Sequence, residues 1–202
     1  MVGIIKYGSG NIYSVFSALK FLGKEVVFIE NLKMLDKVNY LILPGVGSFA
    51  SSMENLEKIG LLEKIVYKLE DGVPFLGICL GLQLLFDWSE EGKIEGFGIL
   101  KGKVVKFKNK NIKIPHMGWN KVKVLKDSLL FKDIMDNSYF YFAHSYYVKT
   151  QKKFIIGKTN YKVDFPSIIV KENIVGTQFH PEKSGEIGLL FLKNFLEGKW
   201  LQ

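Results

Sequence analysis

The first part of the chain alternates short apolar runs with segments in which apolar residues recur at helical spacing. The apolar runs cover residues 2–7, 25–29, 40–43 and 73–77. The helical segments cover residues 12–22 and about 53–69, and a further helix is expected from residue 80 to 86. Strands that alternate with helices in this way predict βαβ units, whose strands form a parallel sheet.

The pattern changes after Trp88. Residues 98–124 show rough alternation of polar and apolar positions with little helical period, which indicates antiparallel strands. Further strands are expected in an aromatic run at 139–148 and in apolar runs at 154–156 and 167–170, followed by a helix at about 184–198. We therefore predict one α/β domain over residues 1–202: a doubly wound, mixed but mainly parallel sheet flanked by helices, with added antiparallel strands.

The formal charge of the chain is +8, but all 28 of its basic residues are lysines. Specific recognition of phosphates and base edges depends largely on arginine, so nucleic-acid binding is less favoured than the charge suggests. The densest basic run, interleaved with apolar residues, comprises Lys101, Lys103, Lys106, Lys108, Lys110 and Lys113. Its alternation indicates the solvated face of antiparallel strands; a surface for an acidic partner is the less favoured alternative.

No apolar run reaches the length needed to span a membrane, and no charged and apolar leader opens the sequence. The single cysteine excludes an internal disulfide. These features predict a cytoplasmic protein that has neither nucleic acid nor a membrane as its partner.

The single cysteine, Cys79, lies in the segment Gly77-Ile-Cys-Leu-Gly81, between a predicted strand and a predicted helix. A nucleophile between two glycines at such a junction is typical of a nucleophile elbow. Glycine is needed on both sides because the strand and the departing helix approach too closely for a Cβ. A helix that begins after Cys79 would point its N–H groups at the sulfur and favour the thiolate. The alternative is a buried, inert cysteine.

The choice between these two interpretations depends on a base and an oxyanion hole. His180 and Glu182 lie two residues apart, so in extended backbone both side chains share a face, and Pro181 argues against a helix there. A carboxylate beside a histidine would fix its tautomer and stabilise its charged form. His144, within the aromatic run, is a rival base. The backbone N–H groups predicted to bind an oxyanion belong to Gly45, Val46, Gly47 and Leu80.

Two further segments carry unusual residues. Gly8-Ser-Gly-Asn11 lacks the spacing of a dinucleotide-binding loop, so we interpret it as a tight turn that suits a partner better than a nucleotide. Met117 and Trp119 flank a glycine in a predicted loop, where they could be core residues or an exposed contact. The three histidines lie far apart in the sequence, so we expect neither a metal site nor a cofactor.

These motifs resemble those of triad glutamine amidotransferases, which carry P-G-x-G, G-x-C-x-G and H-P-E in this order. Within that class the chain is similar to the glutaminase subunits of imidazole glycerol phosphate synthases. The narrower resemblance rests on the segments Tyr7-Gly-Ser-Gly-Asn11, Pro44-Gly-Val-Gly47, Gly77-Ile-Cys-Leu-Gly-Leu-Gln83, Pro115-His-Met-Gly-Trp-Asn120, His144-Ser-Tyr-Tyr147 and Gln178-Phe-His-Pro-Glu-Lys-Ser184. These segments span nearly the whole chain.

The resemblance implies a glutaminase of doubly wound α/β fold that hydrolyses glutamine through Cys79, His180 and Glu182. It further implies that ammonia passes to a (β/α)8-barrel cyclase, with which the chain forms a heterodimer, and that the chain alone is nearly inactive. Gln83 and the backbone around Ser145 are the expected contacts for the amino-acid end of glutamine. The residues expected to face the cyclase are Asn11, Met117, Trp119 and Lys183.

The chain departs from the family pattern at three positions, Lys6, Ser48 and Gly185, none of which belongs to the triad. Lys6 is expected near the docking edge, which leaves open a paralogous glutaminase that supplies ammonia to a sugar-modifying amidotransferase in surface-polysaccharide synthesis. Two less favoured alternatives are a cysteine peptidase, which needs no partner, and a binding subunit that has lost activity. The intact triad argues against the last.

Overall fold

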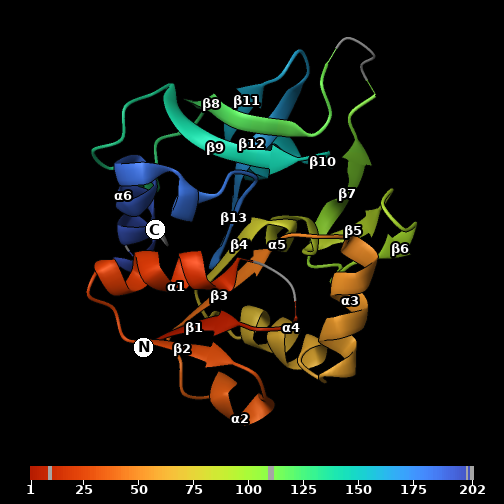
Figure 1. The fold of residues 1–202 in the computed structure, drawn as a ribbon, viewed down its shortest axis with the longest axis vertical. Helices are drawn as coiled ribbons and strands as arrows, with labels where there is room; N and C mark the ends of the chain where they lie inside the picture. Colours follow the sequence, from red (N-terminus) through yellow and green to blue (C-terminus); the bar gives the residue numbers. More distant parts are fainter. Residues whose placement is uncertain (9–10, 109–111, 199, 201–202) are drawn as a thin grey trace.

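A computed structural model of the chain describes residues 1–8, 11–108, 112–198 and 200. Ser9 and Gly10 of the predicted turn, and Lys110 of the lysine run, lie outside the described residues. Within the described part the strands form a nine-stranded sheet of order β2-β1-β3-β4-β13-β12-β11-β8-β9 and a separate four-stranded sheet. Figure 1 shows helices on both sides of the large sheet.

One half of the large sheet is parallel. It consists of β2 (Val26–Ile29), β1 (Val2–Ile5), β3 (Tyr40–Gly45), β4 (Phe75–Cys79) and β13 (Ile174–Thr177). Strands β1, β4 and β13 are buried along their whole length, and β1 and β4 accordingly lie within continuous apolar runs of the sequence. The predicted parallel sheet is confirmed.

The other half is antiparallel, as expected for the second part of the chain. It consists of β12 (Asp164–Lys171), β11 (Ile155–Asn160), β8 (His116–Val124) and β9 (Ser138–His144). The smaller sheet contains β10 (Tyr146–Thr150), β7 (Leu100–Lys106), β5 (Phe86–Ser89) and β6 (Ile94–Glu95). The described members of the lysine run are exposed, and Val104, Val105 and Phe107 between them are buried, so the predicted solvated face is confirmed.

Two separate apolar clusters fix the helices to the large sheet. Helices α1 (Ile12–Phe21) and α6 (Gly185–Leu196) contribute to one cluster, and α2 (Leu32–Leu35), α3 (Phe49–Lys58) and α4 (Leu62–Glu70) contribute to the other. Successive strand residues alternate between them: Ile4 and Ile42 belong to the first cluster, Ile5 and Leu43 to the second. The parallel half of the sheet is therefore covered by helices on both faces (Figure 1).

Four local predictions were wrong. The helix expected over 53–69 is two helices, because the chain breaks at Gly60, which has a positive φ of 68°. The helix after Cys79, α5 (Leu80–Gln83), is a single turn, because Phe86 already begins β5. The aromatic run is divided at Ser145 into β9 and β10, which belong to different sheets. Met117 and Trp119 lie in strand β8, not in a loop.

The remaining elements are short 3-10 turns: η1 (Leu129–Phe131), η2 (Lys152–Phe154) and η3 (Pro181–Lys183). The third corrects the interpretation of Pro181, which begins a helical turn. Proline is tolerated at a first helical position because the N–H that it lacks would have no partner there. Among the described residues, no helix is long and apolar enough to cross a membrane.

Candidate active site

Three neighbouring parallel strands end at one edge of the large sheet and bring the sequence motifs together. Gly45, the last residue of β3, lies opposite Cys79, the last residue of β4. On the other side of β4, Thr177 at the end of β13 lies opposite Ile78, and the chain continues from there to His180. Segments far apart in the sequence therefore meet at the carboxyl ends of the strands, where open α/β sheets bind ligands.

The backbone at Cys79 has the conformation of a nucleophile elbow. Its φ of +54° and ψ of −103° are rare for a residue with a side chain and cost on the order of 1–3 kcal/mol. The flanking glycines permit this turn. A Cβ on Gly77 would lie 2.6 Å from the carbonyl oxygen of Gly81, and a Cβ on Gly81 would lie 1.9 Å from that of Leu43. The predicted close approach of strand and helix is confirmed.

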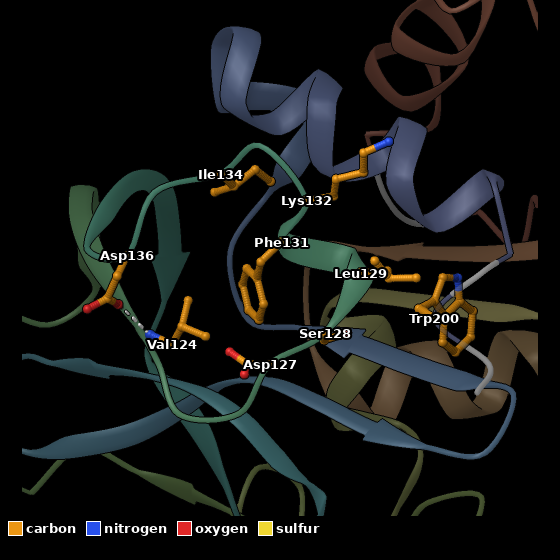
Figure 2. A pocket seen from close by; sticks show the side chains of 9 residues that line it. All are labelled: Val124, Asp127, Ser128, Leu129, Phe131, Lys132, Ile134, Asp136 and Trp200. Carbon is orange, nitrogen blue, oxygen red and sulfur yellow. Dashed lines mark hydrogen bonds between the residues drawn. The ribbon is translucent and has the colours of Figure 1, made fainter.

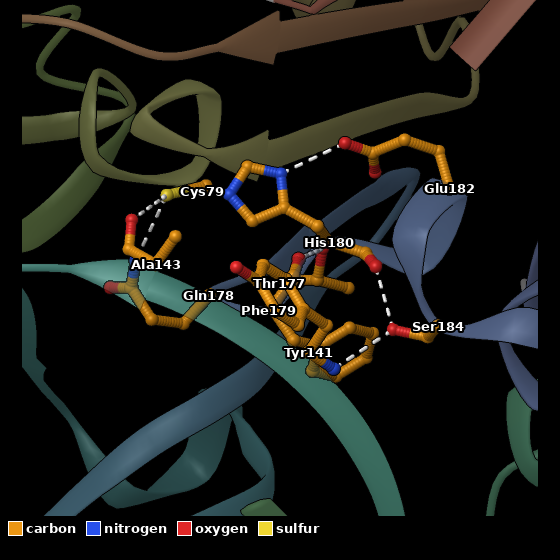
Figure 3. Close-up of polar contacts among 9 residues, drawn as sticks. All are labelled: Cys79, Tyr141, Ala143, Thr177, Gln178, Phe179, His180, Glu182 and Ser184. Atoms are coloured by element: carbon orange, nitrogen blue, oxygen red, sulfur yellow. Dashed lines mark hydrogen bonds and ion pairs between the residues drawn. The ribbon is translucent and has the colours of Figure 1, made fainter. Parts of the chain in front are cut away.

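His180 lies between Cys79 and Glu182 (Figure 3). Its Nδ1 is 2.9 Å from Oε1 of Glu182, and both side chains are almost completely buried. The backbone of His180 is fixed as well: its N–H donates to the carbonyl of Tyr141, and its carbonyl accepts a 2.6 Å hydrogen bond from the hydroxyl of Ser184. The structure thus aligns a sulfur, an imidazole and a carboxylate in the order that a catalytic triad requires.

The charges around His180 favour its protonated form. Burial by itself lowers the pKa of His180, but the negative sulfur of Cys79 and the carboxylate of Glu182 outweigh burial and raise this pKa to about 10. An imidazolium beside Cys79 stabilises the thiolate in turn. Helix α5 contributes less than the sequence suggested, because a single turn has only a small dipole.

His144, the rival base, contacts neither Cys79 nor a carboxylate through the hydrogen bonds that its ring makes. His144 Nδ1 lies 2.8 Å from the carbonyl oxygen of Tyr146, and its Nε2 lies 3.0 Å from Nδ1 of His116. Burial lowers the pKa of His144 to about 3 and that of His116 to about 4, so both rings are neutral. These two histidines contact each other although they are 28 residues apart in the sequence. No group of three or more metal-ligating side chains occurs in the described ranges.

A cavity of about 210 Å³ opens beside Cys79. Its lining includes all of the residues expected to bind an oxyanion or the substrate: Gly45, Val46, Gly47, Leu80, Gln83 and Ser145. Gln83 is buried, and its Nε2 already donates to the carbonyl of Tyr146 at 2.9 Å and to Oε1 of Gln178 at 3.2 Å. Only its side-chain oxygen is therefore left for a ligand.

Sequence reasoning assigned no role to two residues of this site. Glu91 contributes a carboxylate to the cavity lining, and its Oε2 accepts a 2.9 Å hydrogen bond from the N–H of Phe49. Gln178 is completely buried and donates from Nε2 to Sγ of Cys79 at 3.6 Å. Gln178 belongs to the conspicuous segment before His180, a signal that could have drawn attention to it. Glu91 stands in a turn between short strands, and no pattern in the sequence distinguishes it.

Three of the residues expected to face a partner lie on or near β8. Met117 and Trp119 are 64% and 55% exposed, and Met117 also lines the cavity. Trp119 packs edge-on against Tyr141 with ring centroids 6.1 Å apart, and Nζ of Lys183 lies 5.9 Å from the centre of the same ring. Trp119 and Lys183 are thus neighbours, joined through Tyr141, at the rim of the site.

The remaining expected partner residue, Asn11, precedes α1 and makes no side-chain hydrogen bond that caps the helix. The departures from the family pattern have local roles. Lys6 forms an ion pair with Glu30 at 2.5 Å, and the hydroxyl of Ser48 accepts a hydrogen bond from the N–H of Ser51 and so caps α3. Gly185 has a positive φ of 59°, a conformation that favours glycine.

A larger cavity, of about 560 Å³, lies elsewhere, beside η1 and near the end of the chain (Figure 2). It is bounded by side chains such as Leu129, Phe131 and Trp200, and none of its lining residues belongs to the triad or to the oxyanion loop. The candidate active site is therefore not the larger cavity, and it is distinguished instead by the convergence of Cys79, His180 and Glu182.

The family model of class-I glutamine amidotransferases matches residues 4–198. The chain is 52% identical to imidazole glycerol phosphate synthase subunit HisH of Methanocaldococcus jannaschii, over 98% of this chain and 99% of that protein. It is 49% identical to the protein of the same name from Caldanaerobacter subterraneus, over 98% of both chains.

Solved structures show the same fold at low sequence identity. A glutamine amidotransferase structure superposes with a TM-score of 0.77 at 18% identity, covering 97% of both chains. The structure of PurLQS from Thermotoga maritima gives a TM-score of 0.76 at 21% identity, covering 98% of this chain and 97% of that one. The predicted fold class is confirmed.

Proposed function

This chain belongs to the class-I glutamine amidotransferase family, and on that premise we propose that it is the glutaminase subunit of imidazole glycerol phosphate synthase. It would hydrolyse glutamine to glutamate and ammonia for histidine biosynthesis. The observation that carries the proposal is the buried alignment of Cys79, His180 and Glu182 at the edge of the sheet. Residues 1–202 would act as one glutamine amidotransferase domain without a cofactor.

In the first half of the reaction the thiolate of Cys79 attacks the side-chain amide carbon of glutamine. The carbonyl double bond opens, and the resulting oxyanion is bound by the backbone N–H of Leu80 and those of Gly45–Gly47. His180, held by Glu182, donates its proton to the amide nitrogen as the carbon–nitrogen bond breaks. Ammonia leaves, and a γ-glutamyl thioester remains on Cys79.

In the second half the neutral imidazole of His180 takes a proton from a water molecule, whose oxygen attacks the thioester carbon. The carbon–sulfur bond breaks, glutamate is released, and the proton on His180 restores the starting imidazolium–thiolate pair. Glu182 keeps the imidazole oriented through both halves, because it is bonded to Nδ1 and leaves Nε2 facing the sulfur (Figure 3).

The cavity beside Cys79 suits the amino-acid end of glutamine. The carboxylate of Glu91 and the side-chain oxygen of Gln83 are acceptors for the α-ammonium group of the substrate. The backbone around Ser145 lines the same cavity and supplies further polar groups. A volume of about 210 Å³ accommodates one small amino acid.

The partner would be a cyclase subunit of (β/α)8-barrel form, bound as a heterodimer in the cytoplasm over the edge that carries the triad. Met117, Trp119, Lys183 and Asn11 would contact it, and ammonia would cross this interface without meeting bulk water. The alternative role in a sugar-modifying pathway was raised because of Lys6. The side chain of Lys6 forms an ion pair with Glu30 of the same chain. The relatives that match almost the full length support the histidine pathway.

The test is glutamine hydrolysis by the purified chain mixed with the cyclase subunit of the same organism. Cys79→Ala should abolish hydrolysis, and His180→Ala should lower kcat by about 10²–10⁴-fold, because each removes a group that reacts or transfers a proton. His144→Asn, which keeps a donor to the carbonyl of Tyr146, should retain most of the activity. Turnover by Cys79→Ala, or a larger loss in His144→Asn than in His180→Ala, would contradict the assignment.

A further inference from the structure

Gln178 lies beside the nucleophile but belongs to none of the groups that the proposed reaction needs. Its side chain is completely buried, and Nε2 lies 3.6 Å from Sγ of Cys79, within the range of an N–H···S hydrogen bond (Figure 3). We infer that Gln178 is a positioning residue that holds the Cys79 sulfur and stabilises its thiolate. This inference rests on the proposed function, in which Cys79 is the nucleophile.

The direction in which the Gln178 amide points follows from its neighbours. The carbonyl oxygen of Tyr146 can only accept, so Gln83 must turn Nε2 toward it, at 2.9 Å. The second hydrogen on the same nitrogen then points to Gln178, whose Oε1 accepts it at 3.2 Å. Nε2 of Gln178 is thereby left for the sulfur. The order of these amides excludes the reverse orientation, in which a carbonyl oxygen would face the thiolate and repel it.

The carbonyl group of Tyr146, which orients Gln83, is itself held in place. Tyr146 receives a second hydrogen bond at its carbonyl oxygen, 2.8 Å from Nδ1 of His144. His144 in turn accepts at Nε2 from His116, and Nε2 of His116 lies 3.2 Å from Nδ2 of Asn120 in β8. Every group between Asn120 and the sulfur is therefore held by a named partner. The donor presented to Cys79 is rigid, which is what a positioning residue requires.

Besides His180, two further groups contact the sulfur, and they favour opposite protonation states of it. The carbonyl oxygen of Ala143, 3.8 Å from Sγ, can accept from a protonated thiol, and it disfavours a negative sulfur. The N–H of Gln178 favours the negative sulfur instead. With a single helical turn after Cys79, the helix supplies little of the stabilisation, so the donor from Gln178 matters more for the thiolate.

The inference is tested by the pH dependence of iodoacetamide alkylation, which reports on Cys79 alone because the chain has no other cysteine. Gln178→Met removes the donor at similar volume and should raise the apparent pKa of alkylation by about one to two pH units. Gln178→Glu places a carboxylate against the sulfur and should raise the apparent pKa of alkylation further. Thr177→Val is the matched control: it removes a neighbouring buried hydroxyl, which donates to the carbonyl of Phe179, and the variant should be alkylated like wild type.

Thermal unfolding of each variant shows whether it is folded. If Gln178→Met does not fold, Gln83→Met serves instead, because it removes the group that orients Gln178 and should shift the profile in the same direction by less. The inference is overturned if a folded Gln178→Met protein has the wild-type profile, or if Thr177→Val shifts it equally. Alkylation needs no glutamine and no partner. A wild-type complex without glutaminase activity would therefore refute the proposed function while leaving the shift in Gln178→Met as support for the positioning role.

Discussion

Two buried histidines of this protein have opposite protonation because their neighbours differ. His180 faces two negative groups, the sulfur of Cys79 and the carboxylate of Glu182, and its pKa is raised to about 10. His144 faces another histidine and a backbone carbonyl, and burial lowers its pKa to about 3. Solvent is excluded from both, so the neighbouring charges decide which of the two histidines is protonated.

The neutral histidine should make stability depend on pH. Below its ordinary pKa of 6.5, His144 takes up a proton in the unfolded chain but stays neutral in the folded protein until about pH 3. The free energy of unfolding should therefore fall as the pH falls from about 6.5 to 4, with His144 contributing up to about 1.4 kcal/mol per pH unit. The free energy of unfolding, measured by urea denaturation at several pH values in this range, should change less steeply with pH for His144→Asn than for wild type.

His144→Asn is expected to be less stable at every pH, because Nδ1 of His116 loses its acceptor, so the slopes are compared and not the absolute values. Thr177→Val, which removes no titrating group, should keep the wild-type slope. Equal slopes for wild type and His144→Asn would show that His144 is not buried in its neutral form.

Single residues were predictable from the sequence where a motif surrounds them. Cys79 is marked by its two glycines, and His180 by the carboxylate two residues later. Glu91 and Gln178 could not be assigned in the same way, because their roles depend on partners from other segments. Glu91 lines the same cavity as Cys79, and Gln178 acquires its orientation from Gln83 and Tyr146.

At the scale of elements, the elbow is built by contacts between backbones. Gly77, Gly81 and Gly45 all lack room for a Cβ, yet none of them has a positive φ. Their role is therefore the close approach of β3, β4 and α5, not an unusual backbone conformation. The strained φ is carried by Cys79 itself, and packing of the surrounding strands holds it there.

Gly81→Ala should consequently destabilise the protein by more than about 3 kcal/mol or prevent folding, because the added Cβ would lie 1.9 Å from the carbonyl oxygen of Leu43. Gly60→Ala is the control: its φ of +68° is also unfavourable for alanine, but no atom lies within 4 Å of the added Cβ, so a cost of about 1–2 kcal/mol is expected. Chemical denaturation of both variants measures the difference. Similar losses at the two positions would contradict the close approach.

Most elements could be located from hydrophobic periodicity, since buried parallel strands and amphipathic helices leave strong patterns. The wrong predictions lie where the structure changes but the pattern of apolar residues does not. The aromatic run 139–148 looks uniform, but the chain moves from one sheet to another at Ser145. Likewise, residues 80–86 are apolar except for Gln83, and tertiary pairing of Phe86 with Leu100 decides where α5 ends and β5 begins.

At the scale of the whole molecule, the order of the strands creates the site. β13 comes late in the chain but inserts beside β4, so the segment with His180 meets Cys79. Nothing in the local sequence of β13 indicates that it pairs with β4. The family resemblance implied that Cys79 and His180 act together, and the sheet topology shows which strands bring them together. The sheet also places β9 between β8 and η3, so that Tyr141 of β9 contacts both Trp119 of β8 and Lys183 of η3.

These rim residues lead to a prediction about the complex. An exposed tryptophan packed on a tyrosine, with a lysine over the same ring, is a suitable anchor for a partner surface. Trp119→Ala and Lys183→Ala should weaken binding of the cyclase subunit about tenfold or more, or separate glutamine hydrolysis from synthesis. Synthesis driven by added ammonium salt should persist, because it does not need the glutaminase site.

The measurement compares glutamine-driven with ammonium-driven product formation, together with the dissociation constant of the complex. Tyr67→Ala and Lys64→Ala are matched controls. Tyr67 is 54% exposed, and Nζ of Lys64 lies 5.0 Å from the centre of its ring. Both residues lie in α4, whose buried residues belong to the second apolar cluster, whereas the buried residues of β8 and β9 belong to the first. If the control variants weaken the complex as much as the rim variants, or if both rim variants bind and couple like wild type, the cyclase does not dock over Trp119 and Lys183.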